Sequence, residues 1–391
     1  MLQGENIICI ANTSWFGNYA KSTVQIMERL ARHNNVLFVE YHYTVKDIIA
    51  TWRGKQNAPV KRLLGIKSLM KIDTNTGSKV FNFVPPAGLP VYFLKNEKIF
   101  NVLFRFNSYI YRKALQNVIR KLNIQHPVII TAYNPFYGLS LLNKLGEKTN
   151  IYYCYDGVEA GYFGKRIFSV EEMFSKSVDA IITTSDFLNN VKLKLNTNSY
   201  VVKNGVDFPL FSKYAKKEIY TRVRKRVGFI GSLDPRFDID TVEYTVRKLN
   251  HFDFEFTGDM RNETMKNRLK AYPNVLFFDP VKPDDVPELL SKYDVGIIPY
   301  IVNEVNKNIY PLKINEYLAV GVPVVMTPFA SLPEFENMVS VSTDKDDFCA
   351  KLILETETDS TMKLSQRIIF ASDNSWDART ESFSRIIEMF I

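Results

Sequence analysis

The feature that most constrains the fold is the regular alternation of short apolar runs with amphipathic stretches along the whole chain. In the first half the apolar runs are NIICIAN, NVLFVEY, PVIITAYNP, NIYYCYDG and DAIITTS, and polar or glycine residues follow them. The second half repeats the scheme with RVGFIGS, FDFEFTGD, NVLFFDP, DVGIIPY and VPVVMTP. Runs that are apolar throughout indicate strands buried on both faces, and their alternation with helices indicates parallel sheets. We therefore expect an α/β protein built from doubly wound parallel sheets.

The length indicates two such domains, because 391 residues exceed what one hydrophobic core usually organises. The stretch DFPLFSKYAKKEIYTRVRK at 207–225 is expected to connect the domains. The stretch SLMKIDTNTGSK at 68–79 is expected to be a loop.

The composition excludes several classes of protein. With 46% hydrophobic and 24% charged residues, the chain resembles an ordinary soluble protein, and no apolar run approaches the roughly 18 residues of a membrane span. Cys9, Cys154 and Cys349 lie far apart, so no disulfide framework is expected. The N-terminus has Glu5 where a secretion signal carries positive charge. We expect a cytoplasmic protein in a reducing compartment.

Charge is unevenly distributed. Residues 1–210 contain 26 Lys and Arg against 14 Asp and Glu, a net charge of +12, whereas residues 211–391 carry −4. A basic first half suits an anionic substrate, an anionic bilayer or nucleic acid, or is simply a solvated surface. The aromatic residues show no RNA-binding signature, so no nucleic-acid partner is expected. Basic and apolar residues interleave in WRGKQNAPVKRLLGIKSLMK at 52–71, which fits a segment at a membrane interface or a packed helix with a solvated basic face.

The stretch YPLKINEYLAVGVPVVMTP at 310–328 predicts a helix, a stop and a buried strand. Pro311 is tolerated in a first helical turn, while Gly321 suits the left-handed residue that ends a helix and Pro323 bars its continuation. Lys313 and Glu316 lie one turn apart in a helix that otherwise looks buried. A surface ion pair is the simplest interpretation of this spacing.

A second interpretation uses the position of these residues. Ligands of open parallel sheets bind at the carboxyl ends of the strands. There the second domain carries GSLDPR, GDM, DPVKP and the start of the helix at Pro311. Helix amides, Lys313 and Arg236 suit a phosphate, and Glu316 can accept two hydrogen bonds from a ribose diol. The pattern predicts a nucleoside diphosphate site.

The residues also carry a family resemblance. The chain resembles two-domain GT-B glycosyltransferases, in particular the retaining family commonly called family 4, at NGVD (204–207), VGFIGSLDPRFD (227–238) and PLKINEYLAVGVPVV (311–325). The last stretch, NSWDARTESFSRIIEMF at 374–390, resembles that family's final helix. The resemblance implies two Rossmann-like domains facing a cleft: 1–205 for the acceptor, 206–372 for a nucleotide sugar, and a helix at 373–391 that crosses back to the first domain.

The resemblance also implies roles for matching residues. Glu316 matches the glutamate that binds the donor ribose, whereas Asn308 stands where the family has a first glutamate. Ser232 stands where the family has an arginine, so Arg236, alone or with Lys313, would contact the phosphates.

Two candidates lie in the first domain. The loop WFGN resembles the family's loop facing the diphosphate and implicates Gly17, and Asp156 follows the strand where many relatives have a histidine near the reacting sugar. Each has a simpler interpretation as a turn residue, and Arg236 could instead pair with Asp238 or Asp240. The predicted catalytic residues are Asp156, Arg236 and Lys313. The predicted donor-binding residues are Gly17, Gly231, Ser232, Arg236, Val281, Asn308, Pro311, Leu312, Lys313 and Glu316.

The expected activity is transfer of a sugar from a nucleotide-diphosphate sugar to a saccharide or lipid-linked acceptor, with retention, in cell-surface polysaccharide biosynthesis. Neither the aspartates nor the four histidines show convincing metal-ligand spacing, so no metal or other cofactor is expected. Peripheral contact with an anionic inner membrane is a further expectation. Two alternatives stay open: a sugar-nucleotide epimerase of the same fold, which needs no acceptor, and a non-catalytic nucleotide-sugar-binding protein.

Overall fold

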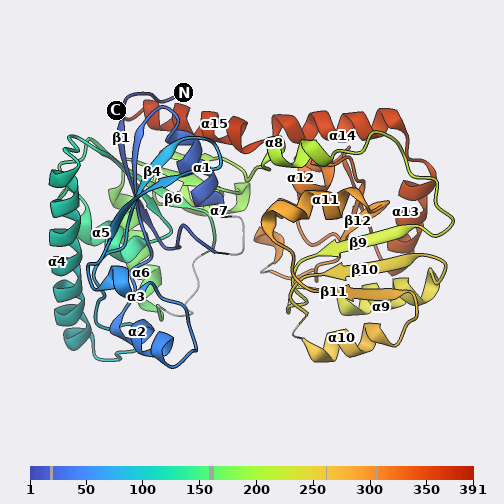
Figure 1. The fold of residues 1–391 in the computed structure, drawn as a ribbon, viewed down its shortest axis with the longest axis horizontal. Coiled ribbons are helices and arrows are strands. Elements are labelled where there is room, and N and C mark those ends of the chain that lie inside the picture. The colour runs from blue at the N-terminus through green and yellow to red at the C-terminus, as the bar shows by residue number, and fades with distance from the viewer. Residues whose placement is uncertain (18–20, 158–162, 261, 305) are drawn as a thin grey trace. The chain divides into compact units, whose positions relative to one another are not determined.

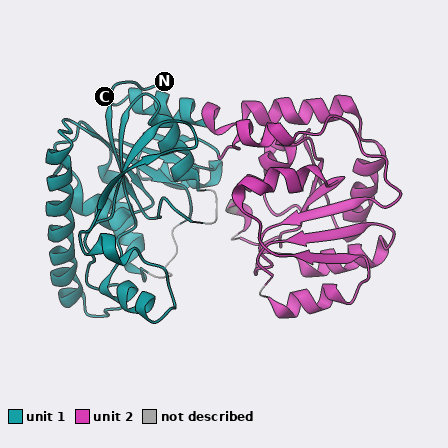
Figure 2. Ribbon diagram, in the orientation of Figure 1, with its two compact units in different colours: residues 1–203, 379–391 teal, residues 204–378 magenta. Residues whose placement is uncertain are grey.

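The computed structural model describes the chain except for residues 18–20, 158–162, 261 and 305, and it divides into two compact units (Figures 1 and 2). Unit 1 comprises residues 1–203 and 379–391, and unit 2 comprises residues 204–378. Each unit has its own parallel sheet with helices packed against it. The predicted α/β class with two doubly wound domains is therefore confirmed.

Unit 1 contains an eight-stranded sheet of order β3-β4-β2-β1-β5-β6-β7-β8. Every neighbouring pair is parallel except β3 and β4. All five apolar runs of the first half form strands here. The strands are β1 Asn6–Ala11, β2 Asn35–Val39, β3 Leu69–Asp73, β4 Lys79–Phe83, β5 Val128–Ala132, β6 Thr149–Cys154, β7 Ala180–Thr183 and β8 Ser199–Val201.

Helices cover both faces of this sheet. Tyr111 and Leu115 of the long helix α4 pack with Ile8 and Ile10 of β1. On the other face, the ring of Phe383 in α15 meets the ring of Tyr153 at 5.3 Å between centroids. The helices are α1 Ser22–Leu30, α2 Val45–Trp52, α3 Val60–Leu63, α4 Glu97–Lys121, α5 Pro135–Leu141, α6 Arg166–Ser177, α7 Asp186–Lys192 and the C-terminal part of α15 Trp376–Glu388.

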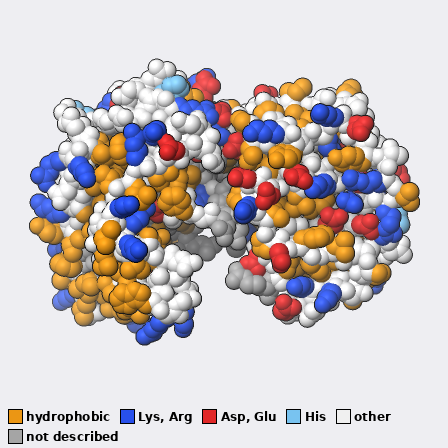
Figure 3. All heavy atoms as spheres, viewed as in Figure 1, with side chains coloured by type: hydrophobic (Ala, Val, Ile, Leu, Met, Phe, Trp, Pro, Cys, Tyr) orange, Lys and Arg blue, Asp and Glu red, His pale blue; other side chains and the backbone are white. Residues whose placement is uncertain are grey.

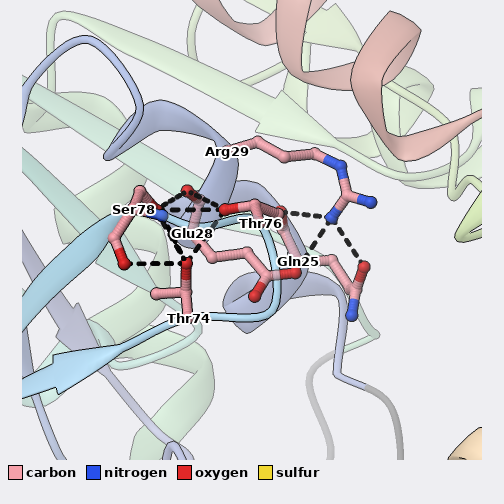
Figure 4. Close-up of polar contacts among 6 residues, drawn as sticks. All are labelled: Gln25, Glu28, Arg29, Thr74, Thr76 and Ser78. Atoms are coloured by element: carbon pink, nitrogen blue, oxygen red, sulfur yellow. Dashed lines mark hydrogen bonds and ion pairs between the residues drawn. The ribbon is translucent and has the colours of Figure 1, made fainter. Parts of the chain in front are cut away.

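The prediction of a loop at 68–79 is wrong. These residues contain β3 and the turn that leads into β4, an antiparallel hairpin at the edge of the sheet. The turn is fastened to the end of α1, because Thr76 Oγ1 and Ser78 Oγ donate to the carbonyl oxygen of Glu28 at 3.1 and 2.7 Å (Figure 4). β3 has a strand partner on one side only, and its burial is incomplete. A half-exposed edge strand lacks the continuous apolar run that marked the inner strands.

Unit 2 contains a six-stranded, fully parallel sheet of order β11-β10-β9-β12-β13-β14, packed against a large hydrophobic core. All five apolar runs of the second half form strands. The strands are β9 Arg226–Ile230, β10 Asp253–Thr257, β11 Val275–Phe278, β12 Val295–Ile298, β13 Val324–Met326 and β14 Val339–Val341. The helices are α8 Phe208–Phe211, α9 Ile239–Lys248, α10 Glu263–Lys270, α11 Val286–Ser291, α12 Leu312–Ala319, α13 Lys345–Glu357, α14 Thr361–Asp373 and the start of α15.

The NGVD stretch has a structural role. Val206 N donates to Asn374 O at 3.1 Å and Trp376 N donates to Val206 O at 2.9 Å, which ties this stretch to the start of α15. A Cβ on Gly205 would lie 2.8 Å from Trp376 N, closer than real Cβ atoms approach backbone. The glycine is needed for this close packing of two chain segments.

Among the described residues, no helix is both long enough and apolar enough to cross a bilayer.

Candidate functional site

The sheet of unit 2 reverses its winding between β9 and β12, since β10 and β11 lie to one side and β13 and β14 to the other. β9 pairs with β10 over five residue pairs but with β12 over only two, Val227 with Val295 and Gly228 with Gly296. The two central strands therefore separate toward their carboxyl ends. Such a switch point is where open parallel sheets bind ligands.

Tyr317 of α12 occupies the point where the strands separate. Its hydroxyl donates to Gly228 O at 3.0 Å and accepts from Ile230 N at 3.3 Å, so it satisfies one backbone group of the last β9 residue that pairs with β12 and one beyond it. The ring is fully buried against Gly296, where a Cβ would lie 2.6 Å from it. These contacts fix α12 against the end of β9.

Lys313 lies one turn before Tyr317 and reaches the end of β9. Its Nζ donates to Tyr300 Oη at 3.2 Å and lies 4.6 Å from the centre of the Phe229 ring. Gly231 follows β9 with φ of +144°, and a Cβ there would lie 2.2 Å from the Lys313 Nζ. Only glycine leaves room for the ammonium at this position without a shift.

Glu316 lies on the next turn of α12, and its side chain is half-buried. Burial raises the pKa of its carboxyl to about 7, although the positive charge of Lys313 acts in the opposite direction. In the described part of the chain, Lys313 contacts Tyr300 and Phe229 and forms no ion pair with Glu316. The surface ion pair that the spacing allowed is not formed. A carboxyl shifted in this way beside a cation is typical of a binding site.

The start of α12 agrees with the sequence prediction. The helix begins at Leu312, and Pro311 precedes it as a buried N-cap residue whose side chain makes no capping hydrogen bond. The first-turn amides of α12 lie one turn before Glu316, on the same helix as Lys313. Gly321, with φ of +80°, follows the end of the helix as predicted.

Arg236 lies close to the same group but is already paired. Its Nε donates to Asp234 Oδ1 at 3.0 Å and Oδ2 at 3.2 Å, and its guanidinium lies 5.7 Å from the centre of the Tyr300 ring. Partial burial acts to raise the pKa of Asp234, but hydrogen bonds from Arg236 and the charge of Lys313 hold it below its ordinary value. Arg236 thus pairs with Asp234, whereas Asp238 caps the start of α9 and Asp240 pairs with Arg268.

The remaining donor candidates of unit 2 lie around this centre. Ser232 follows Gly231 and is half-buried, and Leu312 is partly exposed at the start of α12. Val281 is exposed in the segment after β11, which is the outermost strand on its side. The backbone of Asn308 lies in a short 3-10 helix, Asn306–Asn308, that precedes α12.

Gly17 and Asp156 belong to unit 1. Gly17 follows β1 with φ of +144°, and a Cβ there would lie 3.1 Å from Lys21 Nζ. Asp156 is exposed after β6, and its Oδ1 accepts from the next backbone amide, Gly157 N, at 2.8 Å. The neighbouring Tyr133 donates to Gly157 O at 2.6 Å and holds this turn. Their catalytic and donor roles stay predictions.

Several residues of these sites had no part in the sequence prediction. Tyr300 contacts both Lys313 and Arg236, and Tyr317 holds α12 in place. In unit 1, the carboxylate of Glu40 is buried after β2, where Oε1 accepts from Trp15 N at 3.2 Å and Asn82 Nδ2 at 2.8 Å. The signal available in the sequence was a polar side chain within two residues after a buried strand, as Glu40 is after β2 and Tyr300 is after β12.

Metal ligation has no candidate in the described residues, where no group of three His, Cys, Asp or Glu side chains is arranged to hold an ion. The prediction of a metal-independent reaction stays a prediction.

Comparison with known proteins agrees with this geometry. Residues 224–355, which include the switch point and α12, match the family model described as "Glycosyl transferases group 1". A protein of Bacillus subtilis strain 168 with the name "Putative teichuronic acid biosynthesis glycosyltransferase TuaH" is 29% identical over 261 residues. That match covers 60% of this chain and 66% of TuaH, just under two thirds of its length.

Solved structures share the fold over nearly the whole chain at low identity. A UDP-forming trehalose-phosphate synthase from Burkholderia xenovorans has a TM-score of 0.70 at 9% identity, covering 99% of both chains. A glycosyltransferase from Rickettsia africae ESF-5 has a TM-score of 0.68 at 13% identity, covering 100% of this chain and 99% of that one. A trehalose-6-phosphate structure from E. coli bound with UDP-2-fluoro glucose has a TM-score of 0.69 at 10% identity, with 99% and 100% covered. The predicted resemblance to GT-B glycosyltransferases is confirmed. The two sequence matches support a transferase enzyme.

Proposed function

We propose that this chain is a glycosyltransferase that moves a sugar from a nucleotide-diphosphate sugar to a saccharide or lipid-linked acceptor, with retention, in cell-surface polysaccharide biosynthesis. One observation carries the proposal. Lys313 lies against Gly231 at the switch point, with Glu316 one turn further along α12, and this region lies within the residues that match the group 1 glycosyltransferase model. A cation, uncapped helix amides and a carboxyl are the groups that a nucleoside diphosphate needs.

The diphosphate would lie against Lys313 and the first-turn amides of α12. The Lys313 ammonium is held by Tyr300 and Phe229, so it is positioned before a ligand arrives. Fixed positive groups stabilise charge that develops on a departing phosphate without having to reorganise. Lys313 would therefore act on the leaving group as well as on binding.

Arg236 would complete this phosphate contact at the exposed side of the site. Its guanidinium is bound to Asp234 through both Nε and Nη2. We propose that the guanidinium meets a phosphate while Asp234 holds the group in orientation. Asp234 would thus be a positioning residue for Arg236.

The ribose would be held by Glu316. An ionised carboxylate accepts hydrogen bonds from two vicinal hydroxyls, whereas the protonated form has lost part of that capacity. Because the pKa of Glu316 is raised to about 7, donor binding should depend on pH near neutrality. Ser232, Val281, Asn308, Pro311 and Leu312 are proposed to line the remaining donor contacts.

The chemistry follows the resemblance to the retaining family. The bond from the anomeric carbon to the diphosphate oxygen breaks, and the acceptor oxygen bonds to the same face of that carbon while the diphosphate takes the acceptor proton. No metal or other cofactor is proposed. We propose that Gly17 contacts the diphosphate and that Asp156 acts near the reacting sugar. The basic unit 1, to which both residues belong, is proposed to bind an anionic or lipid-linked saccharide.

The location proposed for this reaction is the cytoplasm. The three cysteines are free and buried, which suits a reducing compartment. No nucleic acid partner is proposed.

The first experiment is a thermal-shift screen of UDP, GDP, ADP and dTDP sugars, since a ligand that binds only the folded chain raises its stability. The second is calorimetric titration of the best donor into the wild type and Glu316→Gln. The lost charged hydrogen bonds predict a Kd about 10 to 150 times higher. Glu357→Gln, at an exposed carboxylate near the end of α13, is the matched control and should not change the Kd.

Three results would refute parts of the proposal. Unchanged affinity of Glu316→Gln would remove the ribose assignment. Conversion of the nucleotide sugar without any acceptor would indicate an epimerase. Donor binding without release of nucleoside diphosphate, in the presence of an acceptor panel, would indicate a binding protein.

A further inference from the structure

The long helix α4 has an apolar row on its solvent-facing side. Ile99, Val102, Phe106 and Tyr109 follow one another at spacings of three and four residues, so they form one stripe along the helix. Between half and two thirds of each of these side chains is exposed. The opposite side of α4 packs into the core through Tyr111 and neighbouring residues. The row is therefore additional to the apolar face that folding needs.

The charges on α4 are almost entirely positive. Glu97 is the only acidic residue of the helix, and Arg166 of α6 pairs with it at 2.5 Å from Nε to Oε1. The basic residues of the helix are Lys98, Arg105, Arg112, Lys113, Arg120 and Lys121. Lys98, Arg105 and Lys113 are exposed beside the apolar row, and Lys113 Nζ lies 5.8 Å from the centre of the Tyr109 ring. The face is both apolar and cationic.

A second exposed row lies on α2. Val45, Ile49 and Trp52 repeat at spacings of four and three residues, and the side chain of Trp52 is 73% exposed. Loop residues 88–89 connect the two helices, since Val45 N donates to Gly88 O at 2.9 Å and Asn107 Nδ2 of α4 donates to Leu89 O at 2.8 Å. Figure 3 shows hydrophobic side chains gathered over α4 and α2 with Lys and Arg among them.

We propose that this face, formed by the rows on α4 and α2 and the lysines and arginines beside them, docks unit 1 on the surface of an anionic lipid bilayer. Exposed apolar side chains with flanking cations are the arrangement of helices that lie in a membrane interface. The cations attract the anionic headgroups while the apolar residues enter the boundary below them. A second copy of the chain would bring the same positive charges together, which disfavours that occupant.

The structure revises the segment from which a membrane contact was predicted. Residues 52–71 form the end of α2, the four-residue helix α3 and the start of β3, and they do not form one interfacial helix. Within them, Arg62 donates to Ser68 O and Asn82 O, both at 3.1 Å, and Leu63 is buried in a small core. Arg62 thus holds the fold of this region, and the docking surface is centred on α4 and Trp52.

The test is co-sedimentation with vesicles of phosphatidylglycerol or of phosphatidylcholine alone, without nucleotide sugar or saccharide. The proposal does not depend on the proposed activity, and these vesicles hold no substrate. Wild type should bind the anionic vesicles, should not bind the neutral ones, and should dissociate at high salt. A triple variant, Lys98→Gln with Arg105→Gln and Lys113→Gln, should lower the partition coefficient between water and anionic vesicles about 100-fold, because it removes three basic side chains near the surface.

A second variant tests the apolar row. Val102→Ser with Phe106→Ser should lower binding about tenfold or more, because both side chains lose apolar contact with the interface. Met362→Ser with Ile369→Ser, at two exposed apolar residues of α14 in unit 2, is the matched control and should bind as the wild type does. Blue-shifted emission on vesicle addition, absent in Trp52→Ser, would show that α2 enters the interface.

Several outcomes would overturn the proposal. These are equal binding to neutral and anionic vesicles, wild-type binding by both α4 variants, or no vesicle binding at all. Self-association that disappears in Val102→Ser with Phe106→Ser, without vesicle binding, would instead identify the face as a contact between copies. All five altered residues of α4 are exposed, and circular dichroism would verify that each variant is folded.

Discussion

Replacing Tyr317 with Phe removes one hydroxyl from the centre of unit 2 and leaves the ring in place. That hydroxyl donates to Gly228 O and accepts from Ile230 N. Gly228 is the last residue of β9 that pairs with β12, and Ile230 lies beyond it, where β12 no longer runs beside β9. The ring volume is unchanged, and no cavity of side-chain size is created.

The expected loss follows from these two contacts. A buried polar group left without its partner costs about 1 to 3 kcal/mol. For one acceptor and one donor, with some relief by water from the nearby strand ends, we expect unit 2 to lose about 2 to 4 kcal/mol of unfolding free energy. For a unit of residues 204–378, this corresponds to a fall in the melting temperature of roughly 5 to 15 °C.

The assay combines thermal unfolding with hydrogen exchange. Peptides that contain Ile230 should exchange faster in Tyr317→Phe, whereas peptides from β1 and β5 of unit 1 should exchange as in the wild type. Because Tyr317 holds Lys313 against Gly231, donor affinity should fall as well. Tyr272→Phe is the control, since its hydroxyl makes only a long hydrogen bond of 3.4 Å to Glu243, and it should cost less than about 1 kcal/mol.

A Tyr317→Phe variant with wild-type stability and wild-type exchange near Ile230 would refute this account. It would mean that the separated strand ends are satisfied by another group and that α12 is held by apolar packing alone.

Further predictions concern the same site. The folded-state pKa of Glu316 is raised from 4.5 to about 7, so the stability that its neutral form contributes is complete below about pH 4.5 and is lost as the pH rises through 7. The unfolding free energy of Glu316→Gln should therefore rise relative to that of the wild type between pH 5 and pH 8. The same difference in unfolding free energy between variant and wild type at pH 5 and at pH 8 would contradict the shift. Wild-type donor affinity, measured by titration calorimetry, should rise from pH 6 to pH 8, and Glu316→Gln should lose this dependence. Gly231→Ala should weaken donor binding at least tenfold, because its Cβ would displace the Lys313 ammonium and the backbone φ of +144° strains any side chain; normal donor titration of this variant would exclude the placement of the phosphate at Lys313. Transfer activity should survive EDTA, and activity abolished by EDTA and restored by magnesium or manganese would show that the reaction needs a metal.

The inner strands of both sheets could be predicted from the sequence because each is buried on both faces. Such strands must be apolar throughout, and that requirement is visible in a run of five residues such as Val128–Ala132. The helix, stop and strand at 310–328 were visible for a similar local reason, since Gly321 and Pro323 restrict their own backbone. Neighbouring residues alone determine these features.

The edge hairpin and the contacts of the site could not be predicted in this way. β3 is partly exposed, so its sequence carries no continuous apolar run, and its position depends on hydrogen bonds to α1, 48 and 50 residues away along the chain. Likewise, the sequence indicated a cation and a carboxyl on one helix but not the partner of Arg236, which proved to be Asp234.

What the sequence alone determined is therefore the class of fold, the order of the buried strands and the residue types available at the strand ends. The tertiary structure decided which of the residues at the strand ends come into contact. Tyr317 and Gly228 are 89 residues apart, yet their hydrogen bond sets where Lys313 and Glu316 lie. Local patterns constrain the backbone nearby, whereas a contact between distant residues depends on how the whole sheet separates and on what fills the separation.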